Sequence, residues 1–239
     1  MEETRHHPAV ELLLRPAAFS GRLQAGRGLA RVTLQLLLFI VAASALYGAV
    51  LAGWRSPRLA GYVAIKLPLL LLGTTSLVML LNWLTATALG SGLRFAQVVA
   101  LTYGAMAVAG WILLGLTPVA AFFTWTAAPM GGADPALRFT HNCLLLTHIG
   151  LIALAGLAGN WVLWQRLREV ARPGCRLGAI YWLWIAAFAF VGCQLSWILR
   201  PFVGSPFYPV VFMRPDCLQR NFYEFVFTEV LPYVLNGGG

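Results

Sequence analysis

Apolar positions along the chain gather into five long runs that short polar segments separate. Each run holds about 20 or more mostly apolar residues, which is the length that a helix needs to cross roughly 30 Å of hydrocarbon. The runs are Leu29–Ala52, Leu59–Leu81, Phe95–Phe122, Phe139–Trp164 and Leu177–Leu199. None of them alternates with period two, and lipid offers the backbone no hydrogen-bond partner, so the pattern predicts helices and not a barrel. We therefore expect an all-α integral membrane bundle with five transmembrane helices over residues 29–199.

The segment before the bundle, residues 1–28, is a basic leader. Its apolar positions, such as Val10 and Leu13, are interspersed with the charged residues Glu11 and Arg15. This pattern predicts a short amphipathic helix that lies on the membrane surface.

The segment after the bundle, residues 200–239, is an aromatic tail. Three prolines and one glycine within residues 200–209 exclude a helix there. Further along, Arg220, Glu224 and Thr228 recur at the spacing of one helical stripe, which predicts a surface helix. The residues expected to contact a partner are Phe222, Phe225 and Phe227. The terminal glycines, Gly237–Gly239, are left out of the predicted fold.

Composition agrees with a chain whose main solvent is lipid. Hydrophobic residues make up 59% of the chain and charged residues only 10%, with a mean hydropathy of +0.75. A water-soluble fold needs about 25% charged residues to cover its surface. These values exclude a soluble enzyme, an intrinsically disordered chain and a small disulfide scaffold.

The basic residues bear on orientation and lipid contact. The chain carries a formal net charge of +9, but the charges are scattered between apolar runs, which argues against a nucleic-acid partner. More of them flank the spans on the leader's side. The positive-inside rule therefore predicts a bacterial inner-membrane protein with a cytoplasmic N-terminus and an extracytoplasmic C-terminus. The residues expected to contact lipid headgroups are Arg15, Arg22, Arg166, Arg168, Arg172 and Arg176.

A few polar side chains lie inside the predicted spans, where burial in lipid is costly. Those expected in the outer half of the membrane are Lys66, His141, Asn142, His148 and Gln194. His141 and His148 are seven residues apart, close to two helical turns, so they share one face of the fourth span. One interpretation is that His148 makes a single interhelical hydrogen bond. The other is a polar pocket that binds a small solute or a lipid headgroup.

Motifs for catalysis and cofactors are missing from the sequence. It contains no G-x-S-x-G, no Walker loop and no acidic pair within a span, so we expect no catalytic residues. A bis-histidine haem would need a ligand from a second helix, and zinc would need three converging ligands, so no cofactor and no metal are expected. A disulfide between Cys143 and Cys217 remains open.

Two short motifs resemble a known family. The leader sequence Leu12-Leu13-Leu14-Arg15-Pro16-Ala17-Ala18-Phe19 and the second-span sequence Lys66-Leu67-Pro68-Leu69-Leu70 are similar to those of bacterial Yip-domain proteins. The resemblance covers about residues 10–200 in pattern. It implies a five-span layout with the N-terminus inside and no particular activity.

These observations predict a non-enzymatic integral membrane subunit or adaptor of a membrane assembly. Its partners would be membrane lipids and either other integral membrane subunits or a second copy of itself. Small residues, such as the Ala155-x-x-x-Gly159 pair, suit close helix packing within the bundle or between chains. The alternative function is a carrier of a small solute or lipid that uses the outer polar pocket. A haem protein or another membrane enzyme comes third.

Overall fold

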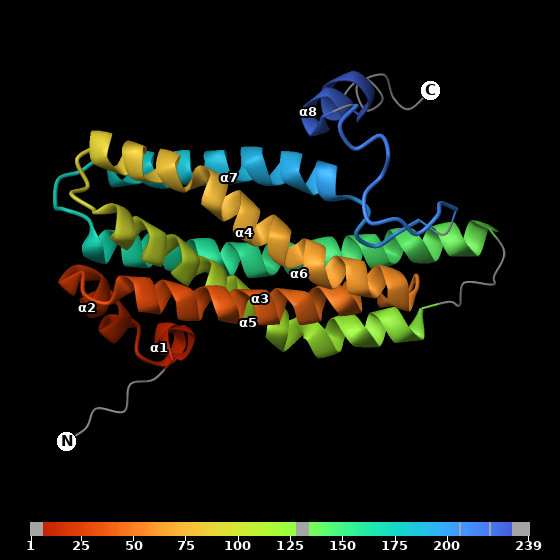
Figure 1. The fold of residues 1–239 in the computed structure, drawn as a ribbon, viewed down its shortest axis with the longest axis horizontal. Coiled ribbons are helices and arrows are strands. Elements are labelled where there is room, and N and C mark those ends of the chain that lie inside the picture. Colours follow the sequence, from red (N-terminus) through yellow and green to blue (C-terminus); the bar gives the residue numbers. More distant parts are fainter. Residues whose placement is uncertain (1–6, 128–133, 206, 220, 231–239) are drawn as a thin grey trace.

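Five long helices run roughly along the long axis of the molecule (Figure 1). The structure is a computed structural model that describes residues 7–127, 134–205, 207–219 and 221–230, so Gly237–Gly239 lie outside the described residues. The helices are α3 (Leu29–Gly53), α4 (Pro57–Ala88), α5 (Phe95–Thr126), α6 (Asp134–Val170) and α7 (Leu177–Leu199). All five are long and apolar enough to cross a membrane, which confirms the all-α, five-span prediction.

Several helices extend beyond the predicted apolar runs. The second continues to Ala88 and the fourth begins at Asp134, because a helix that leaves hydrocarbon keeps its internal hydrogen bonds in the polar layer beyond. Ser56 caps α4 by accepting a hydrogen bond from the Leu59 backbone N–H at 3.2 Å. The predicted runs ended at polar residues, but a helix tolerates such residues at its ends.

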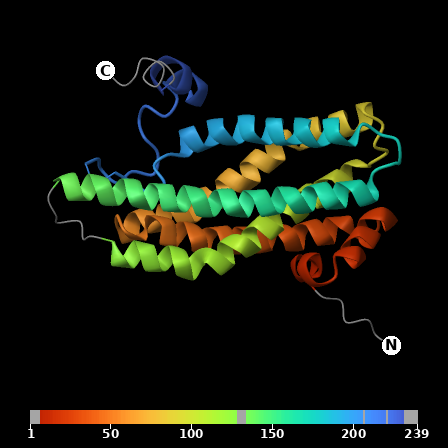
Figure 2. The ribbon, with the colours of Figure 1, turned by 180° about the vertical axis from the view of Figure 1, so that it is seen from behind.

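The helices alternate in direction and pack in a fixed order. α3 packs against both α4 and α5, α6 lies on α5, and α7 lies mainly on α4. Both views show α7 on the outside of the bundle (Figures 1 and 2). We call the end of the bundle that holds residues 8–26 the leader end, and the end that holds residues 200–230 the tail end.

Small residues let the helices approach closely at the centre of the bundle. A Cβ on Gly48 would lie 2.6 Å from the carbonyl oxygen of Val63, and one on Gly159 would lie 2.8 Å from that of Ala105. Ala155, one turn before Gly159, is also buried. The Ala155-x-x-x-Gly159 pair therefore packs α6 onto α5 within the chain.

The leader forms two helices and not one. α1 (Pro8–Leu14) and α2 (Pro16–Ala25) meet at Arg15, because Pro16 cannot continue α1 but suits the first position of α2. Phe19 and Leu23 are fully buried in the same core cluster as the spans. A Cβ on Gly104 would meet the Phe19 ring at 3.1 Å, so a glycine of α5 accommodates the leader.

The tail has two parts. Its first part crosses the tail end of the bundle, where Val203 is buried in a second core cluster with residues such as Tyr47 and Leu144. Its second part holds the short helix α8 (Phe222–Phe225), which passes into a π-helical turn, η1 (Val226–Val230). The second leader helix, α2, and the first part of the tail thus lie at opposite ends of the bundle (Figure 1).

Replacing Gly159 by alanine tests the close contact between α5 and α6. The added methyl meets backbone, which cannot move aside as a side chain can. We therefore expect the free energy of unfolding to fall by about 1–3 kcal/mol and the melting temperature in detergent to fall with it. Gly150→Ala on the same helix is the control, because no atom lies within 4 Å of its Cβ position. Equal melting temperatures for the two variants would contradict this packing.

Candidate ligand site at the tail end

The five polar residues predicted to share a pocket do not meet at one point. Lys66 lies on α4, His141, Asn142 and His148 lie on α6, and Gln194 lies on α7. Each of these helices brings its polar side chain to a different neighbour.

Lys66 anchors the tail. Its side chain is 0% exposed, and its Nζ donates a hydrogen bond to the carbonyl oxygen of Pro201 at 3.0 Å. The ring centroids of Phe212 and Phe202 lie 5.1 and 6.0 Å from Nζ, within the range in which an aromatic face attracts a cation. A cation inside the bundle is thus held by a carbonyl dipole and two rings, all supplied by the tail.

The two histidines of α6 contact two residues at the end of α3. The Nδ1 of His148 and the hydroxyl of Tyr47 are hydrogen-bonded at 3.0 Å, and both side chains are buried. His141 lies beside Trp54, with ring centroids 6.3 Å apart. His141 and His148 are seven residues apart on α6. Tyr47, on α3, and Trp54, directly after α3, are also seven residues apart, so the two contacts follow one another along one interface. The structure therefore gives His148 the interhelical hydrogen bond that the first interpretation expects.

Gln194 and the predicted partner contacts belong to one local cluster. The side-chain oxygen of Gln194 accepts a hydrogen bond from the backbone N–H of Phe222 at 3.1 Å. Trp197 packs against Phe222 and Phe225, with centroids 6.4 and 4.9 Å away. Phe222 and Phe225 thus bind the chain's own α7, and of the three expected partner contacts Phe227, at 63% exposed, stays most available.

A hollow of about 370 Å³ lies where the tail crosses the tail end. Arg55, Arg214 and Asp216 supply its charged groups. Its remaining lining is mostly apolar and comes from Leu59, Pro201, Pro209, Val210, Val211 and Pro215. Arg55 holds the hollow's wall, because its Nε donates to the Ser205 carbonyl and its Nη2 to the Tyr208 carbonyl, both at 3.2 Å.

Charge in this hollow is unbalanced. The carboxylate of Asp216 pairs with Arg200 at 3.3 Å; burial lowers the pKa of Arg200, and Asp216 opposes that shift. Among the described residues no carboxylate forms an ion pair with Arg55 or Arg214. The Arg214 guanidinium instead lies 5.1 Å from the Tyr208 ring centroid. Asp216 also lines the hollow but is paired with Arg200, so Arg55 and Arg214 border it without an ion-pair partner of their own.

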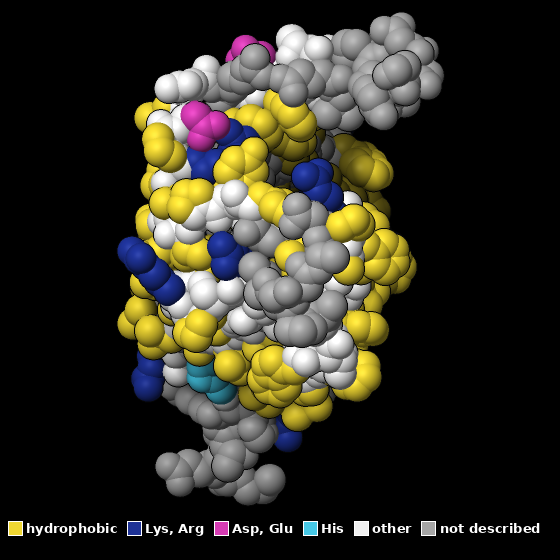
Figure 3. Space-filling view, turned by 90° about the vertical axis from the view of Figure 1, so that its right-hand side faces the viewer, with side chains coloured by type: hydrophobic (Ala, Val, Ile, Leu, Met, Phe, Trp, Pro, Cys, Tyr) yellow, Lys and Arg dark blue, Asp and Glu magenta, His cyan; other side chains and the backbone are white. Residues whose placement is uncertain are grey.

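A second hollow, of about 310 Å³, adjoins the first and shares Ser205 and Tyr208 with it. Arg138, His141 and Asn142 line it, so two of the predicted pocket residues do border a cavity. Arg138 lies 4.7 Å from the ring centroid of Phe207. Seen from this end, basic side chains are spread among apolar ones, and the visible acidic side chains gather towards one edge (Figure 3).

Sequence reasoning missed Arg55, Arg138 and Arg214 as site residues. Arg55 and Arg138 flank apolar runs, where an arginine is usually a topogenic charge, and Arg214 lies in the tail. No spacing connects them, because they come from the turn between α3 and α4, the start of α6 and the tail. Only the path of the tail across the bundle brings Arg55 and Arg214 to one cavity.

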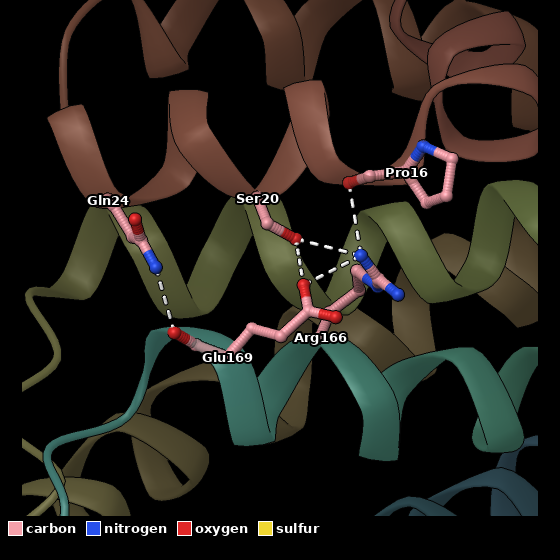
Figure 4. Close-up of polar contacts among 5 residues, drawn as sticks. All are labelled: Pro16, Ser20, Gln24, Arg166 and Glu169. Carbon is pink, nitrogen blue, oxygen red and sulfur yellow. Dashed lines mark hydrogen bonds and ion pairs between the residues drawn. The ribbon is translucent and has the colours of Figure 1, made fainter.

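At the leader end, Arg166 is engaged by the leader (Figure 4). It is 8% exposed, and its Nη1 donates to the Pro16 carbonyl at 3.0 Å, to Ser20 Oγ at 3.0 Å and to Glu169 at 2.7 Å. Ser20 Oγ also donates to the same Glu169 oxygen, and Gln24 Nε2 donates to the Glu169 carbonyl at 2.9 Å.

This network leaves Arg166 little surface for the lipid headgroup expected there. Arg22, also expected to meet a headgroup, pairs with Glu11 at 2.9 Å. The other expected headgroup contacts, which are exposed, are Arg15, Arg168, Arg172 and Arg176. For these four, contact with lipid stays a prediction.

The described residues offer no group of three or more His, Cys, Asp or Glu side chains that could hold a metal ion. All four cysteines are free, so Cys143 and Cys217 do not form the disulfide that the sequence left open.

No protein-family description, curated protein or solved structure matches the chain. The resemblance to Yip-domain proteins therefore stays a prediction.

Gly204 is the residue on which the tail's path depends most directly. Its φ of +76° favours glycine, and a Cβ there would overlap Leu59 Cδ2. We expect Gly204→Ala to loosen the tail and expose it to limited proteolysis. Gly174→Ala is the control, because Gly174 has a φ of +84° but nothing within 4 Å of its Cβ position. Unchanged tail cleavage in Gly204→Ala would contradict the seating described above.

Proposed function

We propose that this multi-pass membrane protein is a non-enzymatic binding protein for an anionic amphiphile, which it holds at the tail end. The observation that carries the proposal is the 370 Å³ hollow, in which Arg55 and Arg214 have no carboxylate partner among the described residues. An anionic group there would give both guanidinium groups an acidic partner. The proposal narrows the carrier hypothesis and moves its site from the span interior to the tail.

The lining of the hollow determines the class of ligand. A guanidinium presents parallel N–H groups that match a carboxylate or a phosphate. The apolar wall formed by Leu59, Val210 and Val211 suits a hydrocarbon portion, and the volume lies within the range of about 300–1,000 Å³ typical of small-molecule sites. A fatty acid or a phospholipid of the adjacent leaflet combines both chemistries.

Orientation gives the site a side of the membrane. The distribution of basic residues favours a cytoplasmic leader end. The tail end then faces away from the cytoplasm of a bacterial cell, and the ligand would enter from the outer leaflet or the space beyond it.

Arg214→Gln tests the proposal with dodecyl phosphate as the probe, added to the protein in a neutral detergent. Loss of a charge-assisted hydrogen bond should weaken binding about 10-fold or more, measured by calorimetric titration. Arg58→Gln is the matched control, because Arg58 is exposed at the start of α4 and does not line the hollow. Equal weakening in both variants, or no binding to the unaltered protein, would overturn the proposal.

A role as a subunit or adaptor is the second candidate. It is supported by large apolar side chains that stay exposed on the tail, with Leu218 79% and Phe227 63% exposed. Burial against a partner would remove this surface from water.

Gentle purification from the native host, with and without Leu218→Ser and Phe227→Ser together, tests that role. We expect a stoichiometric co-purifying protein that the double variant loses and that Arg214→Gln retains. If the unaltered protein purifies without a partner, the subunit role is contradicted. The ligand-binding test does not depend on that outcome.

A further inference from the structure

The leader end carries a second cationic surface, formed where two turns are joined. The turn between α4 and α5 lies beside the turn between α6 and α7 (Figure 1). The backbone N–H of Arg172 donates to the Ser91 carbonyl at 2.8 Å, and that of Arg176 donates to the Leu89 carbonyl at 3.4 Å. The side chains of Arg172 and Arg176 are exposed, and neither forms an ion pair with another described residue.

Two hollows border these joined turns. One, of about 470 Å³, is lined by Arg172, Arg176 and the backbone around Gly90 and Gly174. The other, of about 480 Å³, is lined by Arg94, Arg172 and Trp83 among others, and it shares Gly90 and Arg172 with the first. We call the pair the double hollow.

Glycines keep the double hollow open. Gly90 and Gly92 have φ values of +81° and +69°, which residues other than glycine rarely adopt. A Cβ on Gly92 would lie 3.4 Å from Arg172 Nε, so the missing side chain lets Arg172 lie against the turn.

Charge in the double hollow is of one sign. Its lining contains Arg94, Arg172 and Arg176 and no carboxylate. None of the three takes part in the ion pairs of the described residues. The carboxylate of Glu169, on the last turn of α6, is already bound by Arg166 and Ser20. Three clustered cations without a neutralising partner suit a multivalent anion.

The position of the double hollow points to the headgroup level of a membrane. Trp83 and Phe95, which line it, form a T-shaped pair with centroids 5.8 Å apart. Aromatic rings of this kind concentrate where hydrocarbon meets water. A phosphate at this level would meet the arginine forks, while any attached acyl chains would lie along the apolar helices.

We propose that the double hollow binds a phosphate group, as carried by an anionic phospholipid or by a soluble phosphate. This site is separate from the one at the tail end and does not depend on it. Arg172 would contact the group from either half of the double hollow, with Arg94 and Arg176 on its two sides.

The test compares Arg172→Gln plus Arg176→Gln with a control that removes equal charge from the same end, Arg27→Gln plus Arg31→Gln. Arg27 and Arg31 are exposed and line neither hollow. Each protein is placed in nanodiscs of phosphatidylcholine with phosphatidylglycerol, and the retained lipids are counted by native mass spectrometry. The first variant should lose bound phosphatidylglycerol and the control should keep it.

A second arm identifies the source of the phosphate. The unaltered protein in neutral detergent is titrated with inorganic phosphate and, separately, with phosphatidylglycerol micelles, and its melting temperature is followed. A rise with phosphatidylglycerol alone supports a lipid site, and a rise with inorganic phosphate supports a soluble ligand. Equal lipid retention in the two double variants together with no rise in melting temperature with inorganic phosphate would overturn the proposal. Melting temperatures of the variants without ligand check that both retain the fold.

Discussion

Hydrocarbon offers a polypeptide no hydrogen-bond partner, and the rest of this structure depends on that constraint. Every long segment in the bundle has to satisfy its backbone internally, so it is a helix. Between such helices there is no hydrophobic driving force, and packing has to supply the attraction. Gly48 and Gly159 bring helix backbones into direct contact, which explains the glycine at these two positions, where it would otherwise weaken a helix.

The same constraint moves polar chemistry to the two ends of the bundle, where segments outside the spans provide partners. At the tail end, Lys66 is satisfied by a carbonyl and two aromatic rings of residues 201–212. At the leader end, the Nη1 of Arg166 is bound by Pro16 and Ser20 of α2 and by Glu169. Each end therefore combines a buried cation with a segment that folds back over it. The leader and the tail are parts of the core at their respective ends, since Phe19 and Val203 are both buried there.

Other arginines at the two ends line hollows and form no ion pair with another described residue. At the tail end two of them border an apolar cavity, and at the leader end three border a pair of hollows at the level of an aromatic pair. Guanidinium groups present parallel N–H donors that match a carboxylate or a phosphate, so both places suit the binding of an anion. The two places differ in lining, because the tail-end cavity has an apolar wall while the leader-end hollows are formed largely by turns.

The sequence by itself determined the five spans, because hydrophobic length is a local property that each segment carries alone. It also determined that His141 and His148 share a helix face, since that follows from helical period. Tertiary structure decided what each polar group meets. The histidines contact Tyr47 and Trp54, Gln194 contacts the tail, and Arg55 and Arg214 come together from positions far apart in the chain. These meetings depend on the paths of the leader and the tail, which turns and single glycines such as Gly204 set. These paths leave no periodic pattern in the sequence, so only the tertiary structure shows where arginines without an ion-pair partner lie close together.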